Sequence, residues 1–293
     1  MILVVESGST KADWMLIDKN KRTPYSSIGF NPFFHSKEDI LLELNEHLEL
    51  DLIKKDIQKI FFYGAGCSSK KLNKIIENGL SSFFQNAEVF VEHDLMACAV
   101  SLYQNEPFIA CILGTGSNSC FFDGKKLRED SYALGYILGD EGSGSYFGKR
   151  MLSDFLYNRL PDRMMQEFTR LGVTKEKIFE NIYMKENANV FIASFMPILI
   201  RNRELDYAQN IIKLGINDFL DKHVKCYKEH KSVPVSFVGS VASLLQDELK
   251  EVCNSNGIKL GQIIRRPLEN LVNYHLDILS INTKKINISI NKN

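Results

Sequence analysis

The sequence lacks the features that mark nucleic-acid-binding, membrane-spanning and secreted proteins. Its 36 Lys and Arg residues are balanced by 36 Asp and Glu residues, so the formal net charge is zero and predicts no nucleic-acid or anionic-membrane partner. No apolar run approaches the roughly 20 residues that span a bilayer, and residues 1–6 lack the basic start of a signal peptide. We therefore expect a cytoplasmic protein.

The six cysteines form no CxxC pair and have no clustered histidine partner. This spacing argues against a structural zinc or iron–sulfur site within one short segment and favours reduced, mostly buried thiols. A length of 293 residues with 44% hydrophobic and 25% charged residues is typical of a globular protein of two domains.

A strand–turn–strand pattern occurs twice, about a hundred residues apart. Apolar runs at 2–6 and 12–18 flank the first polar turn, and runs at 108–113 and 120–122 flank the second. Alternating helices and strands follow each hairpin, which predicts a duplicated α/β fold with a cleft between the copies. We expect residues 147–232 to be mostly helical, 233–238 to form the last strand and 283–293 to form a tail.

Both turns have the composition of an anion-binding loop. The first turn offers backbone N–H groups, hydroxyls and a cation, and Glu6 before it could hold Mg²⁺ directly or through water. Either turn alone could be an ordinary hairpin turn, but two at matching places favour a grip on one polyphosphate. The residues of the two turns are Gly8, Ser9, Thr10 and Lys11, then Gly114, Thr115, Gly116, Ser117 and Asn118.

Three further segments have both a chemical and a purely structural interpretation. Asp94 closes a strand, where it could accept a proton from a sugar hydroxyl or cap the next helix. Asp140 and Glu141 lie between glycines before a helix, where they could bind a ligand or cap that helix. Gly239-Ser240 could let an adenine approach the backbone or could simply be a tight turn.

Taken in chain order, these segments resemble the N-acetylglucosamine kinase branch of the BadF/BadG/BcrA/BcrD ATPase family, within the actin-like, sugar kinase and Hsp70 superfamily. The resemblance runs from residue 2 to about residue 275 and includes Gly29-Phe30-Asn31-Pro32 and Arg266-Pro267-Leu268-Glu269. It implies two actin-like (ribonuclease H-like) α/β domains, at 1–105 and 106–275, with a nucleotide and sugar cleft between them. It also implies that 276–293 packs back on the first domain and that the protein is a homodimer.

The resemblance implies an ATP- and Mg²⁺-dependent kinase that phosphorylates the 6-hydroxyl of N-acetylglucosamine or a related amino sugar. Asp94 matches the family's general base, and Glu6 matches the position that holds Mg²⁺ through water. The ATP ligands implied are Gly8, Ser9, Thr10, Lys11, Gly114, Thr115, Gly116, Ser117, Gly239 and Ser240. The sugar ligands implied are Asn31, Asp94, Thr115, Gly116 and Asp140.

One residue departs from the family pattern, and alternatives stay open. The family usually has aspartate where this chain has Glu6, and we expect the longer side chain to reduce but not abolish activity. The acceptor could instead be N-acetylmuramate or glucosamine, or the protein could bind sugar and ATP without turnover. A dehydratase-activator ATPase is disfavoured, because Cys111 and Cys120 flank the second turn and do not match its cluster ligands.

Overall fold

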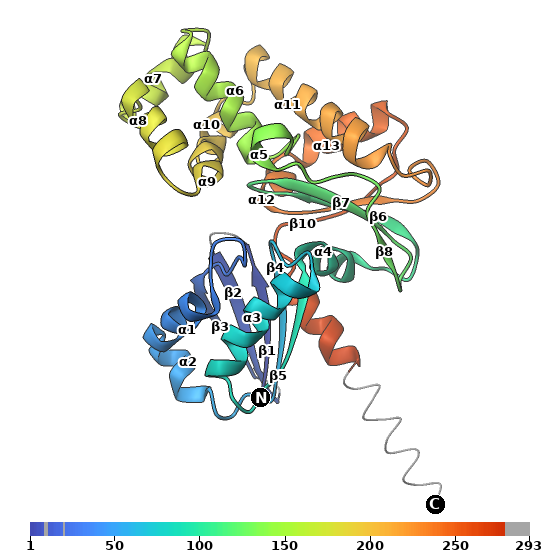
Figure 1. The fold of residues 1–293 in the computed structure, drawn as a ribbon. Helices are drawn as coiled ribbons and strands as arrows, with labels where there is room; N and C mark the ends of the chain where they lie inside the picture. The colour runs from blue at the N-terminus through green and yellow to red at the C-terminus, as the bar shows by residue number, and fades with distance from the viewer. Residues whose placement is uncertain (9–10, 20, 279–293) are drawn as a thin grey trace, which may run out of the picture. The chain divides into compact units, whose positions relative to one another are not determined.

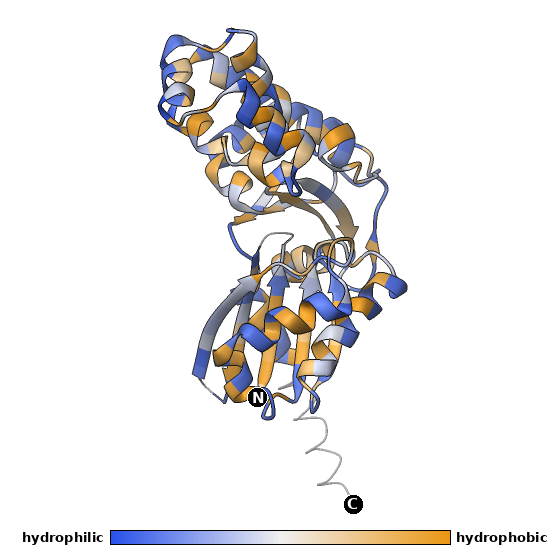
Figure 2. Ribbon diagram, turned by 60° about the vertical axis from the view of Figure 1, so that its left-hand side comes forward, coloured by the Kyte–Doolittle hydropathy of each residue, from blue (hydrophilic) through white to orange (hydrophobic). Residues whose placement is uncertain are grey.

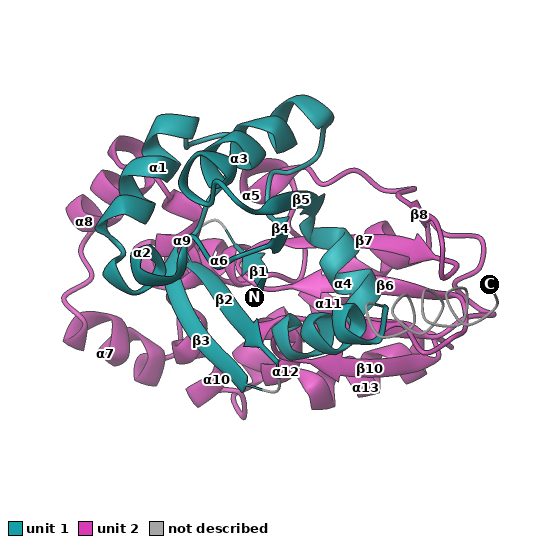
Figure 3. Ribbon diagram, turned by 90° about the horizontal axis from the view of Figure 1, so that it is seen from below, with its two compact units in different colours: residues 1–101, 267–293 teal, residues 102–266 magenta. Residues whose placement is uncertain are grey.

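The chain folds as two compact units in a computed structural model that describes residues 1–8, 11–19 and 21–278. Unit 1 comprises Met1–Ser101 together with the segment that begins at Pro267, and unit 2 comprises Leu102–Arg266 (Figure 3). The chain thus returns to unit 1 at Pro267, about nine residues before the position expected from the sequence. Residues 279–293, which include the expected tail, lie outside the described residues.

Unit 1 is built on a five-stranded sheet of order β3-β2-β1-β4-β5 (Figure 1). The strands β1 to β3 are antiparallel, whereas β4 and β5 run parallel to β1. The strands are β1 (Ile2–Ser7), β2 (Lys11–Asp18), β3 (Lys21–Ile28), β4 (Lys59–Gly64) and β5 (Glu88–His93). The helices are α1 (Lys37–Glu46), α2 (Leu48–Ile53), α3 (Lys70–Phe83) and α4 (Asp94–Leu102).

The start of α1 shows how local sequence sets an element boundary. Ser36 Oγ accepts a hydrogen bond from the Asp39 backbone N–H (3.2 Å), and Asp39 Oδ2 accepts one from the Ser36 N–H (2.8 Å). This reciprocal capping box satisfies two donors that the first turn of a helix leaves unpaired. Ile40 and Leu44 follow one turn apart, and both are fully buried in the core of unit 1.

A helix that includes residues 268–278 explains why the C-terminal segment belongs to unit 1. Its Leu271 and Val272 are fully buried against Val4 of β1 and Ala97 of α4. Arg22 of β3 donates a hydrogen bond to Glu269 of this helix at 3.0 Å. Burial of this apolar face is the main favourable contribution to the free energy of packing the helix on the sheet, so the C-terminal segment belongs to unit 1.

Unit 2 repeats the same topology with a sheet of order β10-β9-β6-β7-β8. Here β6 occupies the place of β1, with an antiparallel β7 on one side and a parallel β9 on the other. The strands are β6 (Phe108–Leu113), β7 (Ser117–Phe122), β8 (Leu127–Arg128), β9 (Val235–Val238) and β10 (Leu260–Ile264). The predicted duplication is confirmed, but the prediction that 233–238 is the last strand is wrong. The missed strand β10 is short and lies at the edge of the sheet, paired with β9.

Helices cover the sheet of unit 2, as predicted for residues 147–232. Hydrophobic residues concentrate on the inner strands and on the helix faces that pack on them (Figure 2). The helical segment after β9 is interrupted at Leu245. The elements are α5 (Gly135–Leu138), α6 (Gly144–Leu156), α7 (Asp162–Arg170), α8 (Lys175–Phe179), the π-helix η1 (Glu180–Met184), α9 (Ala188–Ala193), α10 (Met196–Arg201), α11 (Asp206–Phe219), the π-helix η2 (Leu220–Val224), α12 (Ser240–Leu244) and α13 (Gln246–Ser255). Within the described ranges, no helix is long and apolar enough to cross a bilayer.

Candidate active site

The first glycine turn joins β1 to β2 and is tied to the neighbouring loops of unit 1. The Gly8 N–H donates to the Lys11 carbonyl at 3.0 Å, which closes the hairpin. The buried Ser7 Oγ accepts a hydrogen bond from the Phe30 N–H (2.8 Å). Lys11 is half-exposed and its Nζ pairs with Asp13 Oδ1 at 2.5 Å. Of the four predicted phosphate ligands in this turn, Ser9 and Thr10 lie outside the described residues.

The carboxylates beside this turn suit a partly hydrated Mg²⁺. Glu6 of β1 lies directly opposite Asp13 of β2 in the strand register, one pair below the end of the hairpin. Mg²⁺ in nucleotide sites uses one or two carboxylates and takes its other ligands from phosphates and water. Among the described residues, no cluster of three or more His, Cys, Asp or Glu side chains could form a closed metal cage. Glu6 and Asp13 could therefore supply one or two carboxylates to such an ion.

Asn31 lies in a turn that follows β3. Its side-chain Oδ1 accepts a hydrogen bond from the Phe33 N–H (3.0 Å), while its backbone N–H donates to His35 Nδ1 (3.2 Å). A Cβ added at Gly66 would lie 2.4 Å from Asn31 Oδ1. Asn31, which is 95% buried, thus has a fixed side-chain position beside the loop that follows β4.

Asp94 is the first residue of α4 and directly follows β5. Its Oδ1 is 3.0 Å from His93 Nδ1, and that nitrogen already accepts a hydrogen bond from the Leu95 N–H. Oδ1 is shielded from solvent and has no hydrogen-bond donor among the described residues. Burial raises the pKa of the Asp94 carboxyl above its ordinary value of 3.8, against the opposing influence of His93. This oxygen can accept a hydrogen bond from a ligand hydroxyl, and the raised pKa makes it a stronger base.

The second glycine turn, between β6 and β7, is bound to the start of α6. The Gly144 N–H donates to the Gly114 carbonyl (2.8 Å), and the Ser145 N–H donates to the Thr115 carbonyl (3.0 Å). Ser117 is 94% buried, and its Oγ has no partner in the part of the chain that the structure describes. A buried hydroxyl without a partner is costly, so it is an argument for a ligand at this turn.

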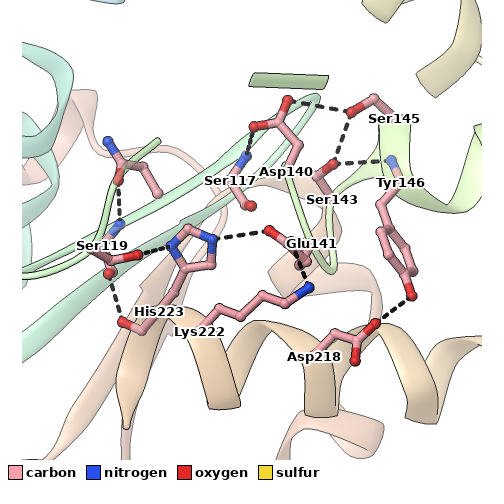
Figure 4. A network of polar contacts seen from close by, with 12 residues as sticks. Ser117, Ser119, Asp140, Glu141, Ser143, Ser145, Tyr146, Asp218, Lys222 and His223 are labelled. Atoms are coloured by element: carbon pink, nitrogen blue, oxygen red, sulfur yellow. Dashed lines mark hydrogen bonds and ion pairs between the residues drawn. The ribbon is translucent and has the colours of Figure 1, made fainter. Parts of the chain in front are cut away.

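Asp140 lies against the second turn (Figure 4). Its Oδ1 accepts a hydrogen bond from the Ser117 N–H at 3.3 Å, and its Oδ2 is 3.5 Å from the donor Ser145 Oγ. A Cβ added at Gly116 would lie 2.9 Å from Asp140 Oδ2, so only glycine leaves room for this carboxylate. Burial raises the pKa of Asp140 above 3.8, partly offset by these donors and by Lys149. The predicted sugar ligands Gly116 and Asp140 are thus in direct contact.

The predicted adenosine turn lies beside the second glycine turn in unit 2. Gly239 has φ of 132°, and an added Cβ would lie 2.1 Å from the Leu113 carbonyl oxygen at the end of β6. Ser240 is exposed and begins α12. The close approach of the two strand ends therefore requires glycine here, and it brings the predicted adenosine and phosphate residues of unit 2 together.

Two residues of this region were missed from the sequence. Lys222 and His223 both contact Glu141, the neighbour of Asp140, from more than 80 positions along the chain. Neither residue belongs to a recognisable motif, and only the packing of η2 brings them to the acidic turn.

Comparison with solved structures shows the class of protein that this fold defines. The chain is 32% identical to a putative N-acetylglucosamine kinase from Porphyromonas gingivalis, with a TM-score of 0.88 over 94% of this chain and 98% of that one. A putative N-acetylglucosamine kinase from Chromobacterium violaceum is 14% identical, with a TM-score of 0.71 over 93% and 98% of the two chains. A ROK family glucokinase from Streptomyces griseus, solved with glucose and AMPPNP, is 14% identical, with a TM-score of 0.51 over 90% and 94%. No protein-family model and no curated protein matches the chain.

The fold is therefore that of a two-domain, actin-like sugar kinase, which confirms the predicted fold class. The chain belongs to the family of N-acetylglucosamine kinase-like proteins, which are phosphotransferases with a sugar as acceptor.

Proposed function

We propose that this sugar kinase transfers the γ-phosphoryl group of MgATP to the 6-hydroxyl of N-acetylglucosamine or a closely related amino sugar. The observation that carries the proposal is the shielded Asp94 Oδ1 at the N-terminus of α4, an acceptor to which no described residue donates a hydrogen bond. A general base must lie within hydrogen-bond reach of the hydroxyl that it deprotonates, and its pKa must allow it to hold the proton. The identity to the Porphyromonas gingivalis protein supports N-acetylglucosamine as the acceptor.

In this proposal, Asp94 accepts the proton of the 6-hydroxyl as that oxygen forms its bond to the γ-phosphorus. The bond from the γ-phosphorus to the oxygen shared with the β-phosphate breaks, so that the products are ADP and a sugar 6-phosphate. Asn31 and Asp140 hold other hydroxyls of the sugar, and both are buried and fixed by hydrogen bonds before any ligand arrives. Phosphoryl transfer depends mainly on such positioning and on charge neutralisation.

The phosphates would be held by the two glycine turns. The described donors are the backbone N–H groups of the second turn other than those of Gly114 and Ser117, the Ser117 hydroxyl and the Lys11 ammonium group, which is half-exposed. Gly239 and Ser240 would pack against the adenosine. Mg²⁺, when bound beside Glu6, would neutralise the charge of the phosphate oxygens. The glucokinase solved with AMPPNP has the same fold and supports ATP as the phosphoryl donor.

A coupled ADP-release assay tests the proposal. The protein is given MgATP with N-acetylglucosamine, N-acetylmuramate, glucosamine, glucose or no sugar. We expect the fastest release with N-acetylglucosamine. A faster release with N-acetylmuramate or glucosamine would identify that sugar as the acceptor instead. Binding of ATP and sugar without stimulated release would establish a non-catalytic binding protein. A homodimer and a cytoplasmic location, both expected from the sequence, stay predictions.

A further inference from the structure

The turn that carries Asp140 has a backbone conformation that needs external support. Asp140 has φ of 57° and Gly142 has φ of 69°, so two left-handed residues flank Glu141. A non-glycine residue in this region is strained, and such strain persists only where the surroundings hold it. The hydrogen bonds from Ser117 and Ser145 hold the Asp140 carboxylate from one side. The support on the other side comes from Glu141.

Glu141 points away from Asp140 and is anchored by two donors on one element (Figure 4). Its Oε1 accepts a hydrogen bond from Lys222 Nζ at 2.8 Å, and its Oε2 accepts one from His223 Nε2 at 3.2 Å. Glu141 is 93% buried. Burial disfavours its charged form, but Lys222 and His223 outweigh this and hold the pKa of Glu141 below 4.5. We call these three residues the Glu141 clamp.

The His223 ring is fixed on every side that the structure describes. It stacks on Phe219, with ring centroids 5.0 Å apart and an interplanar angle of 19°. Its Nδ1 is 3.3 Å from Ser131 Oγ, so a ring that donates from Nε2 to Glu141 can accept from that hydroxyl. The backbone carbonyl of His223 accepts a hydrogen bond from Ser119 Oγ of β7 (2.6 Å), which also fixes the main chain at this residue. The ring is therefore a rigid anchor rather than a mobile surface group.

The backbone of η2 explains how two consecutive residues reach one carboxylate. The helix α11 continues into the π-helix η2, from which both Lys222 and His223 contact Glu141. Short π-helical turns inside helices are often found at functional sites. The clamp thus links the end of α11 to the turn that presents Asp140.

We propose that Glu141, Lys222 and His223 are positioning residues that hold Asp140 in its sugar-binding conformation. The inference rests on the proposed function, because it assigns the clamp to the same sugar site. The clamp touches no substrate in this scheme. It acts through the backbone of Asp140, whose carboxylate must stay between Gly116, Ser117 and Ser145.

The test compares Glu141→Gln with a matched control, Glu248→Gln. Both substitutions neutralise a carboxylate in unit 2 that is paired with a cation. Glu248 lies in α13, and both of its carboxylate oxygens accept hydrogen bonds from Arg203 at 2.6 Å. We expect Glu141→Gln to raise the KM for the sugar about tenfold, the size of one lost charged hydrogen bond, with the KM for ATP within about twofold. We expect Glu248→Gln to leave both KM values unchanged, even where its melting temperature falls equally.

Lys222→Met is the second variant, because the Lys222 side chain is 56% exposed and its loss should not prevent folding. We expect a smaller rise in the sugar KM, and Lys222→Arg should restore the wild-type value. Sugar KM values within about twofold of wild type in both Glu141→Gln and Lys222→Met would overturn the clamp while leaving the proposed function intact. A wild-type protein without sugar-stimulated ADP release would instead overturn the proposed function, and the clamp with it.

Discussion

Replacement of Asp94 by Asn is the substitution that isolates the proposed base. Asn keeps the size of the side chain and one acceptor oxygen, but its amide cannot take up a proton. The shielded Oδ1 accepts no hydrogen bond from the described residues, so the change removes none at that atom. Loss of a general base costs about 10²- to 10⁴-fold in rate, which corresponds to about 3–5 kcal/mol of transition-state stabilisation. We therefore expect kcat to fall by at least about 100-fold.

The matched control is Glu88→Gln. Glu88 begins β5, the strand whose other end leads into Asp94. Glu88 is 61% exposed and pairs with Lys59 at 3.3 Å, an ion pair of a kind worth at most about 1 kcal/mol. We expect wild-type kinetics for this variant in the coupled ADP-release assay, and unchanged melting temperatures for both variants. If Asp94→Asn keeps kcat within about threefold of wild type, Asp94 is not the base and the mechanism is wrong.

Three further predictions follow from the geometry. The proposed base Asp94 acts as a carboxylate, and burial raises its pKa. The apparent pKa of the acid limb in the pH profile of kcat/KM should therefore lie above the ordinary aspartate value of 3.8. An apparent pKa at or below 3.8 would contradict this. Gly116→Ala should lower kcat/KM for the sugar about tenfold or more, because the new Cβ would lie 2.9 Å from Asp140 Oδ2; unchanged steady-state kinetics would refute the contact. His275 is buried against Phe61 and Tyr63, and burial lowers its pKa from 6.5 to about 4, so the unfolded chain binds the extra proton between these values. The free energy of unfolding of unit 1, measured by urea titration, should therefore fall by about 2 kcal/mol from near pH 7 to near pH 5. The His275→Gln variant should show a smaller fall over the same pH range. An equal fall in both proteins would show that His275 is not the cause.

The sequence allowed the duplicated fold to be predicted because local signals mark its repeats. Polar turns that contain glycine, at 7–11 and 114–119, follow apolar strands, and the capping box at Ser36 and Asp39 marks a helix start. The residues of the second turn and Asp140 were predicted as ligands in this way, since each lies in a run of glycines and polar residues.

The features that were missed depend on contacts between distant segments. Lys222 and His223 have no periodic or motif signal, and the bond between Tyr63 and His275 joins residues 212 positions apart. The short strand β10 carries a glycine and a glutamine and pairs with β9 alone among the described strands, so neither composition nor alternation revealed it. Tertiary packing decides all three.

The most direct test of the central claim follows the phosphorus atom itself. The protein is incubated with N-acetylglucosamine and γ-labelled MgATP, and the labelled product is located on the sugar by NMR. We predict that the label appears on the 6-oxygen of the sugar, and that Asp94→Asn produces almost none. Label that appears only as inorganic phosphate, or that stays in ATP with every amino sugar, would contradict the assignment as an amino-sugar kinase.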